Sequence, residues 1–122
     1  MVYRMRRADG SSDPNGTTLA WIDQAGTVRH IGSNAFKWTP GELWKSPHTG
    51  AAYPIRPVIE AEGKTFRLMA LQEKQELHGE VTGLAYWEGA CDVLDADGKV
   101  IGRAFLELAG YSGDLTQHLR GQ

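Results

Sequence analysis

The sequence lacks cysteine almost entirely, with Cys91 the single example in 122 residues. One cysteine forms neither an internal disulfide nor a multi-cysteine zinc site. A dominant charge is lacking as well, because 13 basic and 15 acidic residues leave a net charge of −2, whereas nucleic-acid-binding domains present a basic face. No apolar run reaches the roughly 18 residues that a membrane helix requires. We therefore predict no metal site, no cofactor, no nucleic-acid partner and no membrane span.

The first residues, Met1-Val2-Tyr3-Arg4, contain no apolar stretch of the kind that a signal peptide has. The compartment is therefore expected to be the cytoplasm by default, although no residue identifies it. Arg4, Arg6 and Arg7 form the one local group of positive charge. Arg4 and Arg6 share a face if this segment is a strand, and we interpret the group as a solvated edge.

What the chain has in excess is glycine, 15 of its 122 residues, which favours many turns. Two turns are clear: Asp23-Gln24-Ala25-Gly26 and Asp95-Ala96-Asp97-Gly98 each join two strand-like segments. In both, a glycine supplies the positive φ that a tight hairpin needs. Helical periodicity is weak, so only residues 71–78 and 114–119 are candidates for one or two helical turns.

About eight segments read as strands, at a spacing of roughly 8–12 residues that is typical of all-β sandwiches and barrels. They are residues 2–6, 17–22, 27–31, 36–44, 53–60, 65–71, 84–94 and 99–108. No linker divides the chain. The sequence therefore predicts a single all-β domain over residues 1–122.

Four short motifs occur in a fixed order in the second half of the chain. They run from Trp44 to Pro54 (WKSPHTGAAYP), from Gln75 to Leu77 (QEL), from Tyr86 to Ala90 (YWEGA) and from Gly102 to Tyr111 (GRAFLELAGY). This order resembles the C-terminal domain of the hydroxyneurosporene synthase (carotenoid hydratase) family and its AttH-like, lipocalin-like relatives. The opening segment, residues 3–11, also resembles the start of that domain, so the resemblance covers nearly the whole chain.

The resemblance implies one antiparallel lipocalin-like β-barrel of about eight strands, with at most one or two short helices. Family members pair two such barrels, and only the second is represented in this sequence. Known activities are water addition to carotenoid double bonds and pericyclic cyclisations. The chain departs from the family pattern where Pro57 replaces a usual Trp, where Ala104-Phe105 replaces Gly-Tyr, and where Ala109 replaces Thr. Two hydroxyls are thereby lost, which weighs against an intact family activity.

Three glutamates are candidates for general acid or base chemistry, namely Glu76, Glu88 and Glu107. A carboxyl in an apolar cavity has a raised pKa and can transfer a proton near neutral pH, which alkene hydration requires. We select Glu88, Tyr86 and Glu107 as the catalytic set. Alternation along residues 86–93 places Tyr86 and Glu88 on one face and the more apolar Trp87 on the other. The competing interpretation is that these glutamates lie on a solvated face or pair with an arginine.

Aromatic residues could line a lipophilic pocket. The predicted ligand-binding residues are Trp44, Tyr53, Gln75, Trp87, Phe105 and Tyr111. The competing interpretation is that Trp21, Trp38, Trp44 and Trp87 fill the core, since a barrel of about eight strands is either filled or hollow enough for one small ligand. Cys91 is predicted to be buried and inert. The histidines show no metal spacing, and His48 in the loop after Trp44 is the one to test.

Three functions remain open from the sequence. The first is a module that binds a small lipophilic molecule without chemistry of its own. The second is a hydratase, isomerase or cyclase in which Glu88, with Tyr86 or Tyr111, acts on an unsaturated lipid or isoprenoid. The third is a structural half of a two-barrel assembly. A lone second barrel would expose the surface that meets the N-terminal barrel, so we also predict a homodimer.

Overall fold

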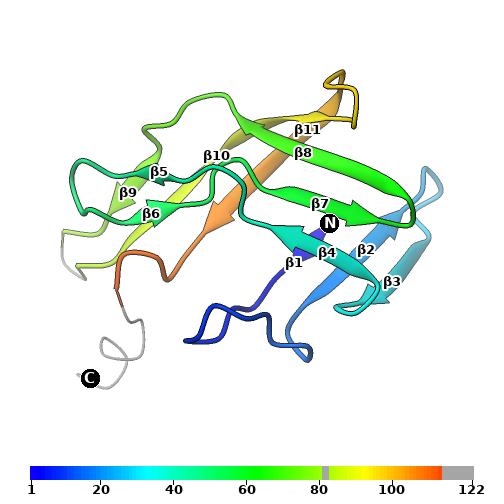
Figure 1. The fold of residues 1–122 in the computed structure, drawn as a ribbon, viewed down its shortest axis with the longest axis horizontal. Coiled ribbons are helices and arrows are strands. Elements are labelled where there is room, and N and C mark those ends of the chain that lie inside the picture. Colours follow the sequence, from blue (N-terminus) through cyan, green and yellow to red (C-terminus); the bar gives the residue numbers. More distant parts are fainter. Residues whose placement is uncertain (81–82, 114–122) are drawn as a thin grey trace.

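The computed structural model describes residues 1–80 and 83–113, which form eleven strands and no helix (Figure 1). All strand pairings in this part are antiparallel. The strands are β1 (Val2–Tyr3), β2 (Thr18–Ile22), β3 (Val28–Gly32), β4 (Phe36–Thr39), β5 (Trp44–Lys45), β6 (Ala52–Tyr53), β7 (Val58–Ala61), β8 (Lys64–Ala70), β9 (Glu76–His78), β10 (Ala85–Leu94) and β11 (Val100–Leu108). The all-β prediction is confirmed. No described helix is long and apolar enough to cross a membrane.

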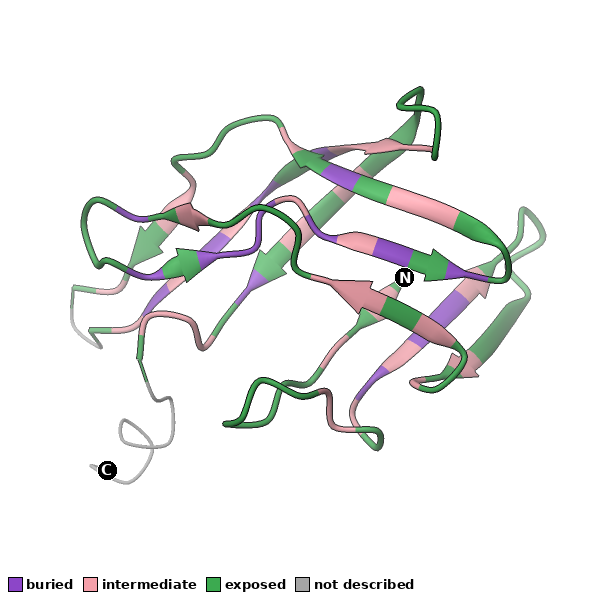
Figure 2. Ribbon diagram, in the orientation of Figure 1, coloured by how far each residue is buried: buried purple, intermediate pink, exposed green. Residues whose placement is uncertain are grey.

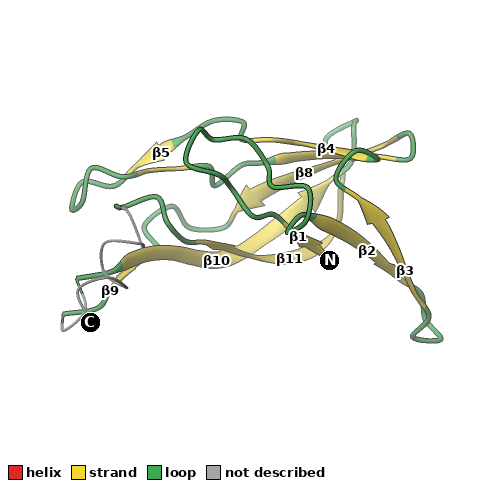
Figure 3. Ribbon diagram, turned by 90° about the horizontal axis from the view of Figure 1, so that it is seen from below, coloured by secondary structure: helices red, strands yellow, loops and turns green. Residues whose placement is uncertain are grey.

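The strands form a curled half-barrel built from three sheets (Figure 3). The largest has the order β11-β10-β8-β7-β4, and β9 also pairs with β10. The second has the order β1-β2-β3, and the third is the β5-β6 pair. Because β4 and β11 are unpaired edges in the described part of the chain, the single closed barrel of about eight strands is not confirmed.

Proline and glycine explain why the strands are more numerous and shorter than predicted. The segment 36–44 is split into β4 and β5 at Pro40 and Gly41, and Gly41 has a φ of 65°. The segment 53–60 is split into β6 and β7 by Pro54 and Pro57, because proline has no N–H to donate to a ladder. Each long predicted strand thereby becomes two short ones that pair with different neighbours.

The two predicted hairpin turns are confirmed and share one construction. The Asp23 and Asp95 carboxylates each accept 2.9 Å hydrogen bonds from the backbone N–H groups two and four residues ahead. Gly26 and Gly98 then take φ angles of 84° and 82°, which cost little without a Cβ. The predicted helical turn over 71–78 is wrong, because Glu76–His78 pairs with β10 as β9. Residues 114–119 lie outside the described residues.

The core consists of two apolar clusters, and Figure 2 colours the buried residues purple. The first joins Leu19, Ile59, Ala61, Leu68 and Cys91, and the second joins Ala51, Tyr53, Ile55, Trp87 and Leu108. Cys91 is buried as predicted, and burial raises its pKa to about 11. The predicted alternation along β10 is also confirmed, since Trp87 is buried while Tyr86 and Glu88 are half-buried. The interior beneath β5 and β6 is thus filled by side chains.

Candidate functional site

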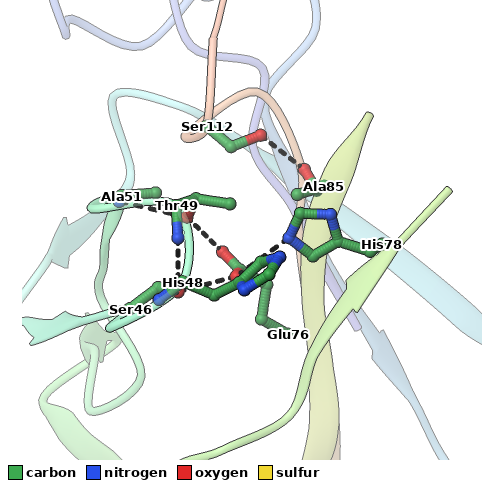
Figure 4. A network of polar contacts seen from close by, with 8 residues as sticks. All are labelled: Ser46, His48, Thr49, Ala51, Glu76, His78, Ala85 and Ser112. Atoms are coloured by element: carbon green, nitrogen blue, oxygen red, sulfur yellow. Dashed lines mark hydrogen bonds and ion pairs between the residues drawn. The ribbon is translucent and has the colours of Figure 1, made fainter. Parts of the chain in front are cut away.

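A buried carboxylate, Glu76, lies at the centre of one polar cluster (Figure 4). Its side chain is only 5% exposed, and β9 sets it directly across from Trp87 on β10. The Ser46 hydroxyl donates a 2.6 Å hydrogen bond to one carboxylate oxygen, and the Thr49 hydroxyl donates a 2.7 Å bond to the other. Both oxygens of the carboxylate are therefore occupied by hydroxyl donors.

These donors come from the turn that joins β5 to β6. Ser46 is buried, and its hydroxyl oxygen accepts 3.1 Å bonds from the backbone N–H groups of His48 and Thr49. The Gly50 N–H donates to the Ser46 carbonyl at 3.0 Å, and Gly50 has a φ of 76°. Serine commonly stabilises such turns through its own backbone contacts. The turn thus presents two hydroxyls in fixed positions beside β9.

The cluster holds Glu76 as an anion. Burial alone raises the pKa of the Glu76 carboxyl, but the Ser46 and Thr49 hydrogen bonds, the nearby Tyr53 hydroxyl and His78 lower this pKa below its usual value. Hydrogen bonds to the charged form favour that form. Glu76 is therefore ionised at neutral pH and is unsuited to the role of general acid.

Two histidines lie beside this carboxylate. The His48 and His78 rings meet edge to face with centroids 4.1 Å apart, and His78 Nε2 lies 3.6 Å from Glu76 Oε1. With Trp44, Pro47 and Lys74, these residues line an open depression of about 320 Å³. In residues 1–80 and 83–113, no group of three or more His, Cys, Asp or Glu side chains is arranged to hold a metal ion.

Tyr53 connects this cluster to a row of aromatic rings. Its side chain is fully buried between Trp44, at a centroid distance of 6.3 Å, and Tyr111, at 5.8 Å. The hydroxyl makes no hydrogen bond to any described residue. Burial first, and then the adjacent Glu76 carboxylate, raise the pKa of Tyr53 above its usual value. Tyr53 is thus a neutral core residue at all ordinary pH values.

A second depression, of about 310 Å³, has Tyr111 in its lining. The Arg4 guanidinium covers the Trp38 ring at 4.3 Å, and the Arg6 guanidinium covers the Tyr111 ring at 3.8 Å. Apolar side chains form most of the remaining lining, among them Pro40, Leu43, Ala52 and Pro54. We refer to this feature as the arginine depression. The interpretation of the arginines as a solvated edge is wrong for Arg4, which is half-buried.

The comparisons with known proteins agree with this architecture. The AttH-like family model matches residues 1–111. The chain belongs to the AttH-like family. A crystal structure at 2.00 Å resolution of a candidate AttH protein from Nitrosomonas europaea is similar to it, with a TM-score of 0.80 and 29% identity. That match covers 91% of this AttH-like chain and 34% of the relative, so the chain spans about a third of the relative's length. The comparison with curated proteins gives no match.

The predicted ligand-binding residues of this AttH-like chain come together only in part. Trp44, Tyr53, Trp87 and Tyr111 all belong to the second apolar cluster. Trp87 is fully buried and donates its indole N–H to the Glu73 carbonyl at 2.7 Å. Gln75 lies on the loop before β9, where its carbonyl accepts the Glu88 N–H at 3.4 Å. Phe105 lies apart from them on β11 and is 67% exposed.

The predicted catalytic residues lie on the opposite face from Glu76. Tyr86 and Glu88 alternate with the buried Trp87 on β10, and Glu107 on β11 is the direct partner of Glu88. None of the three lines either depression. Strand alternation alone sends Glu76 and Glu88 to different sides of the AttH-like sheet. Sequence reasoning missed the Arg4–Trp38 contact, because no local pattern links residues this far apart.

Proposed function

We propose that this AttH-like domain, residues 1–122, binds a small lipophilic molecule in the arginine depression. The supporting observation is an open hollow of about 310 Å³ whose walls are mostly apolar, with Trp38, Leu43 and Tyr111 among them. Small-molecule sites are concave and largely apolar with a few placed polar groups, and this volume is at the lower end of their range. Leu43 is 53% exposed, so a ligand there would cover apolar surface.

The other hollows fit a lipophilic ligand less well. The interior beneath β5 and β6 is occupied by Trp87, Tyr53 and Ile55, all fully buried. The depression beside Glu76 contains an ionised carboxylate, two histidines and Lys74. Covering such groups with an apolar ligand would cost desolvation free energy. The arginine depression therefore supports binding best.

Titration with N-phenyl-1-naphthylamine, a neutral dye that fluoresces in apolar sites, tests this function. We expect saturable binding that Leu43→Ser weakens by about tenfold, because a buried leucine contributes roughly 1.5–3 kcal/mol. Ile22→Ser is the matched control, since Ile22 is an exposed aliphatic residue on β2 outside the depression. Absence of saturable binding, or equal weakening by both variants, would contradict the proposal.

A separate observation supports the structural role as a second function. The outer face of the largest sheet carries exposed apolar side chains, among them Phe105, Met69 and Leu77. The chain spans about a third of its Nitrosomonas europaea relative, and exposed apolar patches commonly mark interaction surfaces. For this chain we propose that a second copy covers this face. Phe105→Glu should then lower the mass measured by light scattering from dimer to monomer, and a wild-type monomer at high concentration would contradict the dimer.

Catalysis by Glu88, with Tyr86, Tyr111 or Glu107, stays a prediction of the sequence, as does the narrower assignment to hydroxyneurosporene synthase. Glu88, Tyr86 and Glu107 lie outside both depressions, which favours binding over chemistry. Incubation of the protein with an unsaturated isoprenoid, with Glu88→Gln beside the wild type, tests the enzymatic alternative. Turnover that disappears in Glu88→Gln would support it, and turnover that persists would remove Glu88 from the mechanism.

A further inference from the structure

Two positively charged side chains rim the arginine depression. Arg4 and Arg6 follow β1 two residues apart in the chain, and both side chains line the depression. Each guanidinium lies over an aromatic ring, Arg4 4.3 Å from the Trp38 centroid and Arg6 3.8 Å from the Tyr111 centroid. A cation–π contact of this kind holds the guanidinium in place, and the N–H groups at its edge point away from the ring face.

Hydrogen bonds to neutral groups hold both arginines in place. Arg4 Nε donates to the Ser12 hydroxyl at 2.7 Å, and Arg4 Nη2 donates to the Gly10 carbonyl at 2.9 Å. Arg6 Nη2 donates to the Gly110 carbonyl at 2.7 Å. These acceptors orient the two side chains without neutralising their charge. Pre-ordered side chains lose less entropy when a ligand binds.

The acidic residues of the same loop are engaged elsewhere. The Asp9 carboxylate accepts hydrogen bonds from the backbone N–H and the hydroxyl of Ser11, at 2.9 and 2.6 Å. Asp13 lies 3.9 Å from Arg7. Within residues 1–80 and 83–113, no carboxylate forms an ion pair with Arg4 or Arg6. Two positive charges therefore meet at the edge of an apolar hollow with no anionic partner from the described chain.

We propose that Arg4 and Arg6 bind an oxyanion head group, a carboxylate or phosphate, on the lipophilic molecule held in the arginine depression. This inference rests on the proposed function and specifies its ligand as an anionic amphiphile. Arginine suits this role because its planar fork pairs with carboxylate and phosphate oxygens in charge-assisted hydrogen bonds. The apolar body of the ligand lies against Leu43 and Pro40, and its head group lies at the arginine rim.

A matched pair of dyes distinguishes the contribution of the anionic head group to binding from that of the apolar body. The dye 8-anilino-1-naphthalenesulfonate has the same ring system as N-phenyl-1-naphthylamine and adds one sulfonate. We expect the anionic dye to bind the wild-type protein about tenfold more tightly than the neutral dye, as expected for a charge-assisted contact. Added salt should weaken binding of the anionic dye and leave that of the neutral dye nearly constant.

Variants then locate the contact. Arg4→Gln and Arg6→Gln should each lower the preference for the anionic dye, the ratio of the two dissociation constants, by about tenfold. Arg4→Lys keeps the charge but not the planar fork, so it should keep part of the preference. Arg67→Gln is the matched control, because Arg67 is an exposed arginine on β8 outside the depression. It changes the net charge equally and should leave the preference unchanged.

The outcomes distinguish the two proposals. Failure of the neutral dye to bind overturns the proposed function itself. Equal binding of both dyes by the wild type, or equal loss of preference in Arg4→Gln and Arg67→Gln, overturns the head-group inference and leaves lipophile binding standing. Displacement of the dye by dodecanoate or dodecyl phosphate, but not by dodecanol, supports the inference, and the more effective of the two identifies the carboxylate or the phosphate as the preferred head group.

Discussion

Glu88 and Glu107 are direct cross-strand partners on β10 and β11, and both carboxylates point to the outer face of the sheet. Like charges directly opposite each other destabilise an antiparallel pair. No described basic residue forms an ion pair with either glutamate. Beyond the Ala90–Phe105 pair on the same face, Asp92 and Arg103 have opposite charges and an N–O distance of 2.7 Å. The β10–β11 ladder therefore has an unfavourable charge pair at Glu88–Glu107 and a favourable one at Asp92–Arg103.

This pair leads to the first prediction, on stability. Glu107→Lys should raise the free energy of unfolding by roughly 0.2–1 kcal/mol, because it replaces repulsion across the strands with attraction. Urea unfolding at low and high salt measures the gain, which should shrink as salt screens the charges. Glu107→Gln is the control and should give a smaller gain. A loss of stability in Glu107→Lys would contradict the repulsion.

Local chemistry made part of this fold predictable. The Asp23 and Asp95 turns need only an aspartate carboxylate and a glycine three residues later in the chain. Both turns form as expected. The inward position of Trp87 follows from alternation, which is also local. The strands β5, β6 and β9 are two or three residues long. Such short strands are defined by their distant partners, so no window of the sequence contains their signal.

The candidate site was harder to predict for the same reason. Glu76 was one of three glutamates in the sequence that could carry chemistry, and nothing nearby distinguished it. Its hydroxyl partners, Ser46 and Thr49, are 30 and 27 residues away. Arg6 meets the Gly110 carbonyl across 104 residues. Tertiary pairing brings these groups together, and a single sequence holds no record of that pairing.

A second prediction concerns Gly41, between β4 and β5. Gly41 has a φ of 65°, and a Cβ there would overlap the Arg56 carbonyl oxygen. Gly50 has a φ of 76° but no neighbouring atom within 4 Å of such a Cβ. Gly50→Ala should therefore cost only the roughly 1–2 kcal/mol of the left-handed conformation. Gly41→Ala should cost clearly more in urea unfolding, and equal losses would show that the overlap is relieved without strain.

A third prediction concerns the pH dependence of stability. Because the folded pKa of Glu76 is lowered below its unfolded value, its ionised form stabilises the fold above the unfolded pKa, and this stability is lost as the pH falls through the folded pKa. Urea unfolding from neutral pH down to about pH 3 should show this loss. In Glu76→Gln the loss should shrink, whereas Glu60→Gln, an exposed glutamate on β7, should retain it. An identical pH profile in wild type and Glu76→Gln would contradict the argument.

A fourth prediction concerns the Ser46 hydroxyl, which links the β5–β6 turn to Glu76. Ser46→Ala removes one donor to a buried carboxylate and one acceptor for two backbone N–H groups. Leaving buried polar groups unpaired costs roughly 1–3 kcal/mol. Thr49→Val removes the other donor at an exposed position and should cost less. Thermal unfolding of the two variants compares their losses of stability, and a larger loss in Thr49→Val than in Ser46→Ala would contradict the prediction.

The last prediction weighs a surface ion pair against backbone strain at the β7–β8 hairpin. Glu62 is the one non-glycine residue with a positive φ, 52°, among residues 1–80 and 83–113, and Gly63 follows with 75°. Two positive φ angles define the turn type that favours Asn-Gly. Glu62 also pairs with Arg29 through bonds of 2.6 and 3.0 Å, but exposed ion pairs contribute little.

Relief of the strain should therefore outweigh loss of the pair, so Glu62→Asn should raise Tm by a few degrees. Arg29→Gln, which removes the pair without changing the turn, should lower Tm slightly, and high salt should abolish that decrease. A Tm for Glu62→Asn below that of the wild type would show that the ion pair outweighs the strain.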